Sequence, residues 1–242
     1  MFPKVDFGPV KVSCVDHLEL KEMILNRYSL VQEESVSIIT LNWEFVSKSY
    51  YFTKYRNKLL EADIITADGF PVYIFLKKIF SLNKRVTGAD LVEWIFKKEE
   101  IKNIVIIGSQ HQNEILEKYE GRVAFFYDGL VDKELWQNQK LRSALNKPQN
   151  KIILLALDSA KQLNLSREIK AQFKGKTIIG IGGSLDFISE KTKRCPASFS
   201  RFGLEWFYRL CQDPLRLYKR YFFVYPYGFF SYFKQHLKKI IS

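Results

Sequence analysis

Short runs of apolar residues recur along the first 190 residues and predict the strands of one sheet. These runs lack the alternation of apolar and polar positions that a half-exposed strand shows. Strands that are apolar on both sides are typical of a parallel sheet with helices on both faces. The predicted strands span residues 36–41, 63–67, 104–108, 122–127, 151–157 and 177–182.

The segments between these strands predict helices, which makes the fold class α/β. Parallel strands need crossover connections, and helices supply them in right-handed βαβ units. We therefore expect residues 1–190 to form a body built on a Rossmann-like, mostly parallel sheet flanked by helices. The predicted helices span residues 45–61, 71–80, 90–98, 113–119, 133–145 and 166–173.

Small or polar residues follow nearly every predicted strand. Ligands of such sheets bind beyond the carboxyl ends of the strands, so these positions would line one cleft. Hydroxyls, carboxylates and bare backbone N–H groups suit a phosphorylated or sugar-like ligand. The strand-end positions are Thr40 and Asn42, Asp68 and Gly69, Gly108 and Ser109, Asp128 and Gly129, Asp158 and Ser159, and Gly182, Gly183 and Ser184.

Several of these motifs have a structural interpretation beside a functional one. Asp68-Gly69 is a turn sequence, yet a carboxylate fixed at a cleft is also what a general base requires. Arg85 is either a solvated charge or a bidentate ligand for a diphosphate. Lys161-Gln162 is either a solvated loop pair or a nucleotide contact, and the spacing does not decide between them. The glycines of residues 180–183 let the backbone approach a phosphate closely.

Charge changes the picture at the C-terminus. The chain has 242 residues, a mass of 28.5 kDa and a net charge of +12. Residues 191–242 hold eleven Lys or Arg and two acids, so this segment, which we call the tail, carries +9 of that charge. A strongly basic segment attracts an anionic partner. The sequence thus predicts a near-neutral body and a basic tail.

The tail is also rich in aromatic residues. Nine of the thirteen residues between Tyr221 and Phe233 are aromatic, and Pro226 and Gly228 predict a break in any long helix. These rings either pack on the body or lie in a membrane interface with flanking cations at anionic lipid. Stacking on single-stranded nucleic acid ranks lower, because the charges bracket the aromatic block and do not interleave with it.

Other classes of site receive little support. Three widely spaced cysteines, Cys14, Cys195 and Cys211, argue against a disulfide framework or a zinc site. The three histidines are scattered, so no metal set or catalytic triad is apparent. The N-terminus shows no signal peptide pattern, and no run is long enough for a spanning helix. GxGxxG after an early strand and the P-loop motif are both missing.

Taken in order, these motifs resemble the WecG/TagA/CpsF glycosyltransferases (GT26) over residues 36–220. The order and spacing of the set are far more specific than any one motif. The matching stretches are Thr40-Leu-Asn42, Thr66-Ala-Asp68-Gly69-Phe-Pro71, Arg85-Val-Thr-Gly88-Ala-Asp90-Leu91, Tyr127-Asp-Gly129, Lys161-Gln162, Gly180-Ile-Gly-Gly-Ser-Leu-Asp186-Phe187, Lys193-Arg194-Cys-Pro196, Gly203-Leu-Glu205-Trp206-Phe-Tyr-Arg209 and Pro214-Leu-Arg216.

This resemblance implies an inverting transfer of a sugar from a UDP-sugar to a polyprenyl-diphosphate-linked saccharide, with no metal or other cofactor required. It places the enzyme peripherally at the cytoplasmic face of a bacterial plasma membrane, in the synthesis of capsule, exopolysaccharide or wall polymer. The expected partners are the donor, the lipid-linked acceptor and an anionic membrane surface, without nucleic acid. The oligomeric state stays open, a homo-oligomer included.

The resemblance also implies roles for individual residues. It places the catalytic base at Asp68 and donor contacts at Thr40, Asn42, Arg85 and Gln162, and it makes the tail an appendage that docks on the membrane and completes the site. The strand-end glycines Gly108, Gly182 and Gly183 would lie beside the donor. Since no Asp-X-Asp pair is present, the cations available to the leaving diphosphate are Arg85, Arg209, Arg216 and Arg220.

Two positions depart from the family pattern. Ala160-Lys161-Gln162-Leu163 stands where the family usually has Pro-Lys-Gln-Glu, and Asp128 stands where many members have His. We expect the first change to bear on nucleotide contact or on the donor sugar. A basic nucleic-acid-binding protein and a non-catalytic scaffold of the same fold are the alternatives.

Overall fold

A six-stranded sheet forms the centre of the computed structural model, which describes residues 2–80, 85–108, 111–128, 135–190, 192–196, 199 and 202–241. Its strand order is β4-β3-β8-β7-β5-β6, and the paired strands are parallel. The strands are β3 (Val36–Leu41), β4 (Ile64–Ala67), β5 (Ile104–Ile107), β6 (Val123–Tyr127), β7 (Ile152–Leu155) and β8 (Thr177–Gly180). The prediction of an α/β fold with a mostly parallel sheet is confirmed.

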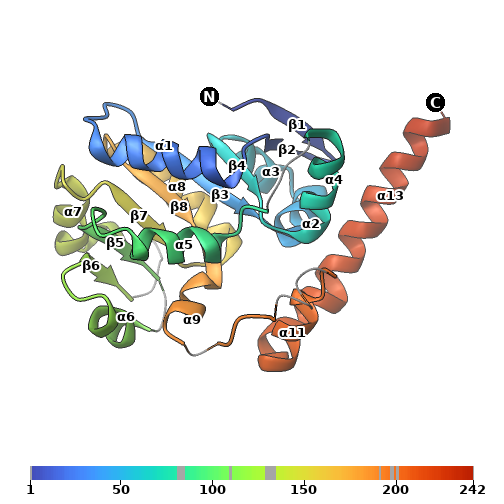
Figure 1. Ribbon diagram of the computed structural model, residues 1–242. Helices are drawn as coiled ribbons and strands as arrows, with labels where there is room; N and C mark the ends of the chain where they lie inside the picture. Colours follow the sequence, from blue (N-terminus) through green and yellow to red (C-terminus); the bar gives the residue numbers. More distant parts are fainter. Residues whose placement is uncertain are drawn as a thin grey trace.

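Helices cover both faces of this sheet (Figure 1). One face packs against α1 (His17–Ser29), α5 (Gly88–Lys97) and α6 (Gln112–Lys118). The other packs against α2 (Trp43–Tyr51), α3 (Thr53–Leu60), α4 (Phe70–Phe80), α7 (Gln139–Asn146) and α8 (Ser159–Gln172). Successive strand residues such as Ile38 and Ile39 are buried on opposite faces. Each strand is therefore apolar throughout, because both of its sides lie in a core.

The first 35 residues add elements that the sequence pattern did not predict. A two-stranded antiparallel hairpin, β1 (Lys4–Phe7) and β2 (Val10–Ser13), precedes α1. Its strands are only four residues long, too short for a clear periodicity. Helix α1 did carry a signal, since Asp16 and Glu19 form a capping box at its N-terminus.

Three predicted helices match the structure to within two residues at each end, and the other three differ by more. The single helix predicted over residues 45–61 is wrong, because Phe52 is extended (φ −120°, ψ 100°) and separates α2 from α3. The helix predicted from residue 166 begins at Ser159, capped by Asp158, so Lys161-Gln162 lie in a helical turn. In the segment 133–145, Lys133 and Glu134 lie outside the described residues, a 3-10 turn (Leu135–Gln137) follows, and α7 begins at Gln139.

The tail is helical. Beyond β8, the chain forms a 3-10 turn (Gly182–Ser184) and α9 (Leu185–Ile188), and the tail then forms α11 (Glu205–Gln212), α12 (Pro214–Lys219), a π-helical turn (Arg220–Val224) and α13 (Tyr225–Ile241). The predicted break at Pro226 and Gly228 is wrong. Pro226 and Gly228 lie within a helix that continues from α12 through the π-helical turn into α13. The π-helical turn, in which the N–H of Tyr225 donates to the carbonyl of Arg220, directly precedes Pro226 and changes the hydrogen-bond spacing where the proline has no N–H to donate. Figure 1 shows α13 leading away to the C-terminus.

One face of α13 packs on α2. The ring of Phe229 stacks on Trp43 at 4.1 Å between centroids, and Trp43 Nε1 donates to the carbonyl of Tyr225 at 3.1 Å. A Cβ at Gly228 would come within 2.0 Å of Ser47 Oγ, so glycine permits this close helix contact. Part of the aromatic block, including Phe229, therefore packs on the body, which is one of the two arrangements that the sequence allowed.

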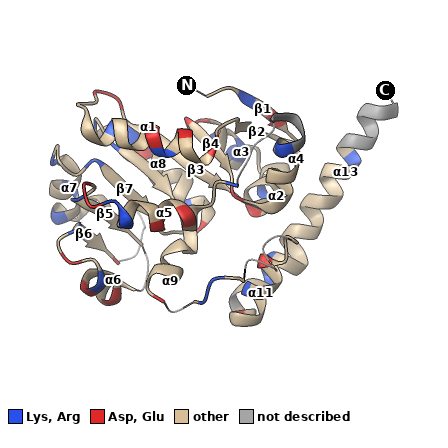
Figure 2. Cartoon of the chain, in the orientation of Figure 1, with Lys and Arg blue, Asp and Glu red and all other residues tan. Residues whose placement is uncertain are grey.

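The other face of α13 is exposed and largely uncharged. Figure 2 shows the long uncharged stretch, which corresponds to residues 221–233 of the sequence. Among the helices in the described part of the chain, none combines the length and apolar character needed to cross a bilayer.

Candidate active site

Two neighbouring cavities open where the carboxyl ends of the strands meet the tail. The larger cavity has a volume of about 840 Å³, and the second, which we call the aromatic cavity, has about 380 Å³. Three side chains line both of them: Asn42, Asp68 and Arg209. The carboxyl group of Asp68 can therefore contact ligands in either cavity.

The larger cavity collects most of the residues that the strand-end pattern and the resemblance singled out. It lies over β3, β4, β7 and β8, as expected for a parallel sheet. Its lining includes charged side chains of both signs and residues of the first turn of α8. The predicted residues along it are Thr40, Asn42, Asp68, Asp158, Ser159, Lys161, Gln162, Gly182, Gly183, Ser184, Arg209 and Arg220.

Hydrogen bonds to the backbone fix three of these side chains. Thr40 Oγ1 donates to the carbonyl of Gly180 at 2.8 Å, which ties β3 to β8. Gln162 Nε2 donates to the carbonyl of Leu157 at 2.5 Å. The side chain of Asn42 caps α2 by accepting the N–H of Glu44 at 2.9 Å. The polar wall is therefore held in place before any ligand binds.

Other predicted positions lie elsewhere or outside the description. Gly108 has a φ of 87°, and a Cβ there would come within 2.5 Å of Leu157, so its local role is in packing. Asp128 is exposed after β6. Ser109 and Gly129 lie outside the described residues, and so does the side chain of Arg216, whose backbone belongs to α12.

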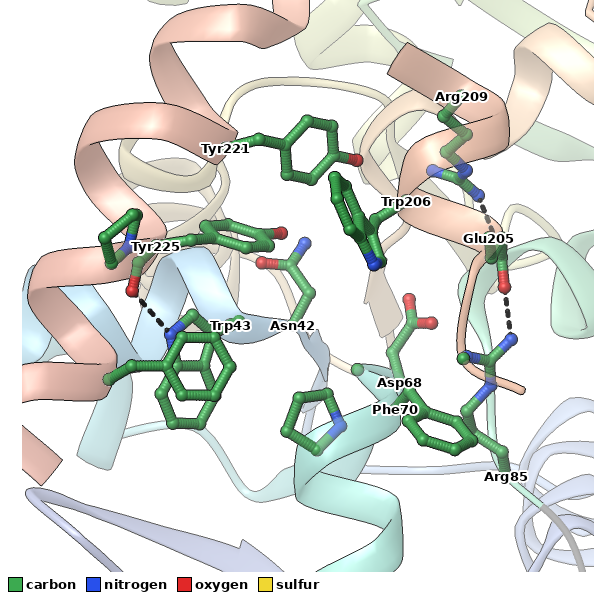
Figure 3. A pocket seen from close by; sticks show the side chains of 15 residues that line it. Asn42, Trp43, Asp68, Phe70, Arg85, Glu205, Trp206, Arg209, Tyr221 and Tyr225 are labelled. Carbon is green, nitrogen blue, oxygen red and sulfur yellow. Dashed lines mark hydrogen bonds and ion pairs between the residues drawn. The ribbon is translucent and has the colours of Figure 1, made fainter. Parts of the chain in front are cut away.

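The aromatic cavity is built jointly by the body and the tail (Figure 3). Charged groups from Arg85 and Glu205 stand beside Asp68 on one side. The rings on its walls belong to Trp43, Phe70, Trp206, Tyr221, Tyr225 and Phe229, the last four of them from the tail. The sequence predicts no role for these rings individually, although the density of aromatic residues in the tail is a signal of such a wall.

Asp68 lies at the end of β4 with a perturbed carboxyl group. It is partly exposed, and the N–H of Gly88 at the start of α5 donates to its Oδ2 at 3.3 Å. Burial raises the pKa of Asp68 to about 6, with Glu205 adding to the rise and Arg85 and Arg209 opposing it. A carboxylate with a pKa of this kind at a cavity junction can accept a proton near neutral pH.

The pKa of Glu205 is shifted in the opposite direction from that of Asp68. It forms ion pairs with Arg85 of the body and with Arg209 one turn further along α11. Burial alone would raise the pKa of Glu205, but the two guanidinium groups outweigh burial and hold the pKa below its ordinary value. Glu205 is thus a link between the body and the tail that is charged at neutral pH.

A second ion pair between body and tail involves Arg220. Its partner is the buried carboxylate of Glu44 in α2, which also accepts from Lys48 Nζ at 2.6 Å and from Ser159 Oγ at 3.0 Å. Burial favours the neutral acid, yet Arg220 and Lys48 keep the pKa of Glu44 below its usual value. The pair fixes the Arg220 guanidinium at the wall of the larger cavity.

Comparison with known proteins identifies the family. The pattern that describes the "Glycosyl transferase WecG/TagA/CpsF family" matches residues 5–241. A protein of Bacillus spizizenii strain W23, named N-acetylglucosaminyldiphosphoundecaprenol N-acetyl-beta-D-mannosaminyltransferase, is 29% identical over 214 residues, which cover 84% of this chain and 79% of that protein. The chain therefore belongs to the WecG/TagA/CpsF family of glycosyl transferases.

Proposed function

We propose that this glycosyltransferase moves a sugar from a UDP-sugar to a hydroxyl of a saccharide carried on a polyprenyl diphosphate, with Asp68 as the general base. The observation that carries the proposal is that Asp68 lines both cavities. A transferase of this kind needs two substrates to meet at one proton acceptor. The name of the Bacillus relative, which includes an undecaprenol-diphosphate saccharide, supports the class of acceptor.

The larger cavity suits the donor. Its volume of about 840 Å³ is in the range of pockets that bury ligands of nucleotide size. Arg209 and Arg220 contribute guanidinium groups to its wall, and these can bind a diphosphate through paired N–H donors. We propose that they, rather than a resident metal ion, neutralise the charge that develops on the leaving UDP.

The aromatic cavity suits the acceptor saccharide. Sugar rings present apolar C–H faces that pack on aromatic rings, while their hydroxyls need polar partners. The cavity offers both, with Trp43 and Trp206 among its rings and Asp68 among its polar groups. In this arrangement Asp68 removes the proton of the acceptor hydroxyl, and the oxygen attacks the anomeric carbon opposite UDP. A single base is sufficient for this inverting displacement.

A transfer assay tests this function. The purified enzyme is incubated with a panel of UDP-sugars, including UDP-N-acetylmannosamine, and with N-acetylglucosamine on a short polyprenyl diphosphate. We expect one donor to yield free UDP and an acceptor lengthened by one sugar, with inverted anomeric configuration. Transfer to a non-lipid acceptor only, or retention of configuration, would contradict the proposal.

The tail has an exposed apolar face that suits a membrane. Phe222, Phe223 and Phe230 expose 63%, 69% and 68% of their surface. Lys219 and Lys234 flank the uncharged stretch that carries them. Aromatic rings with neighbouring cations bind the interface of an anionic bilayer. We propose that this face brings the enzyme to its lipid-linked acceptor, and its apolar character favours lipid over nucleic acid.

Replacing these three phenylalanines with serine is expected to lower binding to vesicles by at least about tenfold, because the apolar part of interfacial binding is removed. Co-sedimentation with vesicles that contain anionic lipid measures the effect. Leu18, Val31 and Phe52 are apolar residues of the body that are also well exposed, by 60% or more, and their serine variant is the matched control. Equal losses in the two triple variants, or none in the first, would contradict a docking role for the tail.

A further inference from the structure

The carboxylate of Glu205 divides its two oxygens between the body and the tail. One oxygen, Oε1, accepts from Arg209 Nη2 at 3.0 Å within α11. The other, Oε2, pairs with Nη2 of Arg85, which precedes α5 in the body. Figure 3 shows Arg209, Glu205 and Arg85 in one row beside Asp68. One side chain of the tail therefore organises two cations next to the proposed base.

The surroundings hold this row firmly. The side chains of Arg85 and Glu205 expose only 17% and 24% of their surface, so water screens the pair weakly. The guanidinium of Arg209 also lies 4.6 Å from the ring centre of Phe187, which fixes it from the other side. Its buried Nε has no hydrogen-bond partner among the described residues. Arg209 is thus positioned and keeps one donor unused.

Two carboxylates of the aromatic cavity consequently have different tasks. Glu205 is bound to two arginines and stays ionised at neutral pH, whereas Asp68 accepts a single long hydrogen bond, from Gly88, within the part of the chain that the structure describes. A carboxylate with both oxygens engaged is a poor proton acceptor. Glu205 therefore acts on the reaction through its neighbours.

We propose that Glu205 is a positioning residue, which holds the guanidinium groups of Arg85 and Arg209 in one row beside Asp68 and offsets their charge there. The inference rests on the function proposed above. It assigns one side chain of the tail a specific part in tuning the base, in addition to any role of the tail in membrane binding.

The charges around Asp68 set the direction in which loss of the Glu205 charge should shift the pKa of Asp68. The charged groups that face it are Arg85 from the loop before α5 and Glu205 and Arg209 from α11. Tyr221 and Tyr225 line the same cavity. Removal of the negative charge of Glu205 leaves two uncompensated cations near Asp68. These stabilise its ionised form, lower its pKa and make it a weaker base.

The experiment compares Glu205→Gln with wild type by kcat/KM between pH 5 and 8, using the donor and acceptor of the transfer assay. In wild type, kcat/KM should fall about tenfold per pH unit below about pH 6, where Asp68 becomes protonated. In Glu205→Gln, we expect this acid limb to move to lower pH by about one unit and kcat at pH 7.5 to fall by up to about tenfold. Glu205→Asp should restore part of both values.

The matched control is Glu93→Gln. Glu93 also pairs with a basic residue beyond the body, Arg194 at 3.1 Å, but it lies outside the lining of both cavities. The Glu93→Gln substitution should change neither the acid limb of the pH profile nor kcat. Limited proteolysis of the tail and thermal unfolding report the folded and docked fraction of each variant.

An unmoved acid limb in a folded, docked Glu205→Gln variant overturns the inference, and so does a fall in kcat that only follows the loss of folded protein. The function proposed above fails separately, through an active Asp68→Asn enzyme. In a double-mutant cycle with Arg85→Gln, the two losses should be non-additive, because Glu205 acts through Arg85. Additive losses would also contradict the inference.

Discussion

Replacement of Asp68 with asparagine is expected to lower kcat by about 10²- to 10⁴-fold, the range that general base catalysis contributes. Asparagine keeps the size of the side chain, and its amide has no basic oxygen to take a proton. The KM for the UDP-sugar should stay close to the wild-type value, because the walls of the larger cavity are unchanged. Steady-state release of UDP in the presence of the lipid-linked acceptor measures both quantities.

The control for this variant uses the other end of the same strand. Asp63 precedes β4 and pairs with Lys170 at 2.5 Å, remote from both cavities. Asp63→Asn should reduce the stability of the fold while leaving kcat per folded molecule near wild type. If Asp68→Asn turned over within a few-fold of wild type, Asp68 would not be the base, and the two-cavity mechanism would lose its proton acceptor.

The sequence predicts the sheet and much of the larger cavity for one physical reason. Parallel strands buried on both faces are apolar throughout, and their carboxyl ends meet along one edge. Thr40 and Asp68, which are 28 positions apart in the chain, therefore line the same cavity. Their proximity follows from the topology, whereas their chemical roles stay predictions.

The aromatic cavity could not be predicted in the same way. Its walls depend on how the tail docks, and that docking is set by contacts between distant residues such as Trp43 and Phe229. The sequence held two local hints, the density of aromatic residues in the tail and the i,i+4 spacing of Glu205 and Arg209 on one helical face. The wrong prediction of a break at Pro226 had a related cause, since the helix accommodates the proline by a π-helical turn directly before it, and no local sequence pattern predicts that turn.

The second large effect concerns Arg220, whose guanidinium has both a structural and a proposed catalytic task. Arg220→Gln should lower kcat by about 10²- to 10³-fold, because one of the cations that stabilise the leaving diphosphate is lost. It should also destabilise the fold, because breaking a buried ion pair costs up to about 3–5 kcal/mol. The cost should fall below that limit, since Glu44 keeps its bonds to Lys48 and Ser159. Steady-state kinetics and urea unfolding measure the two effects.

The double variant Glu44→Gln/Arg220→Gln separates these two tasks. Both charges are then absent and the two amides can share a hydrogen bond, so most of the lost stability should return. Turnover should stay low, because the diphosphate still lacks its cation. Arg220→Lys should lie between wild type and Arg220→Gln in kcat, since an ammonium group keeps the charge but loses the paired N–H donors. Recovery of turnover together with stability in the double variant would mean that Arg220 only holds the tail on the body, and that the donor diphosphate depends on other cations.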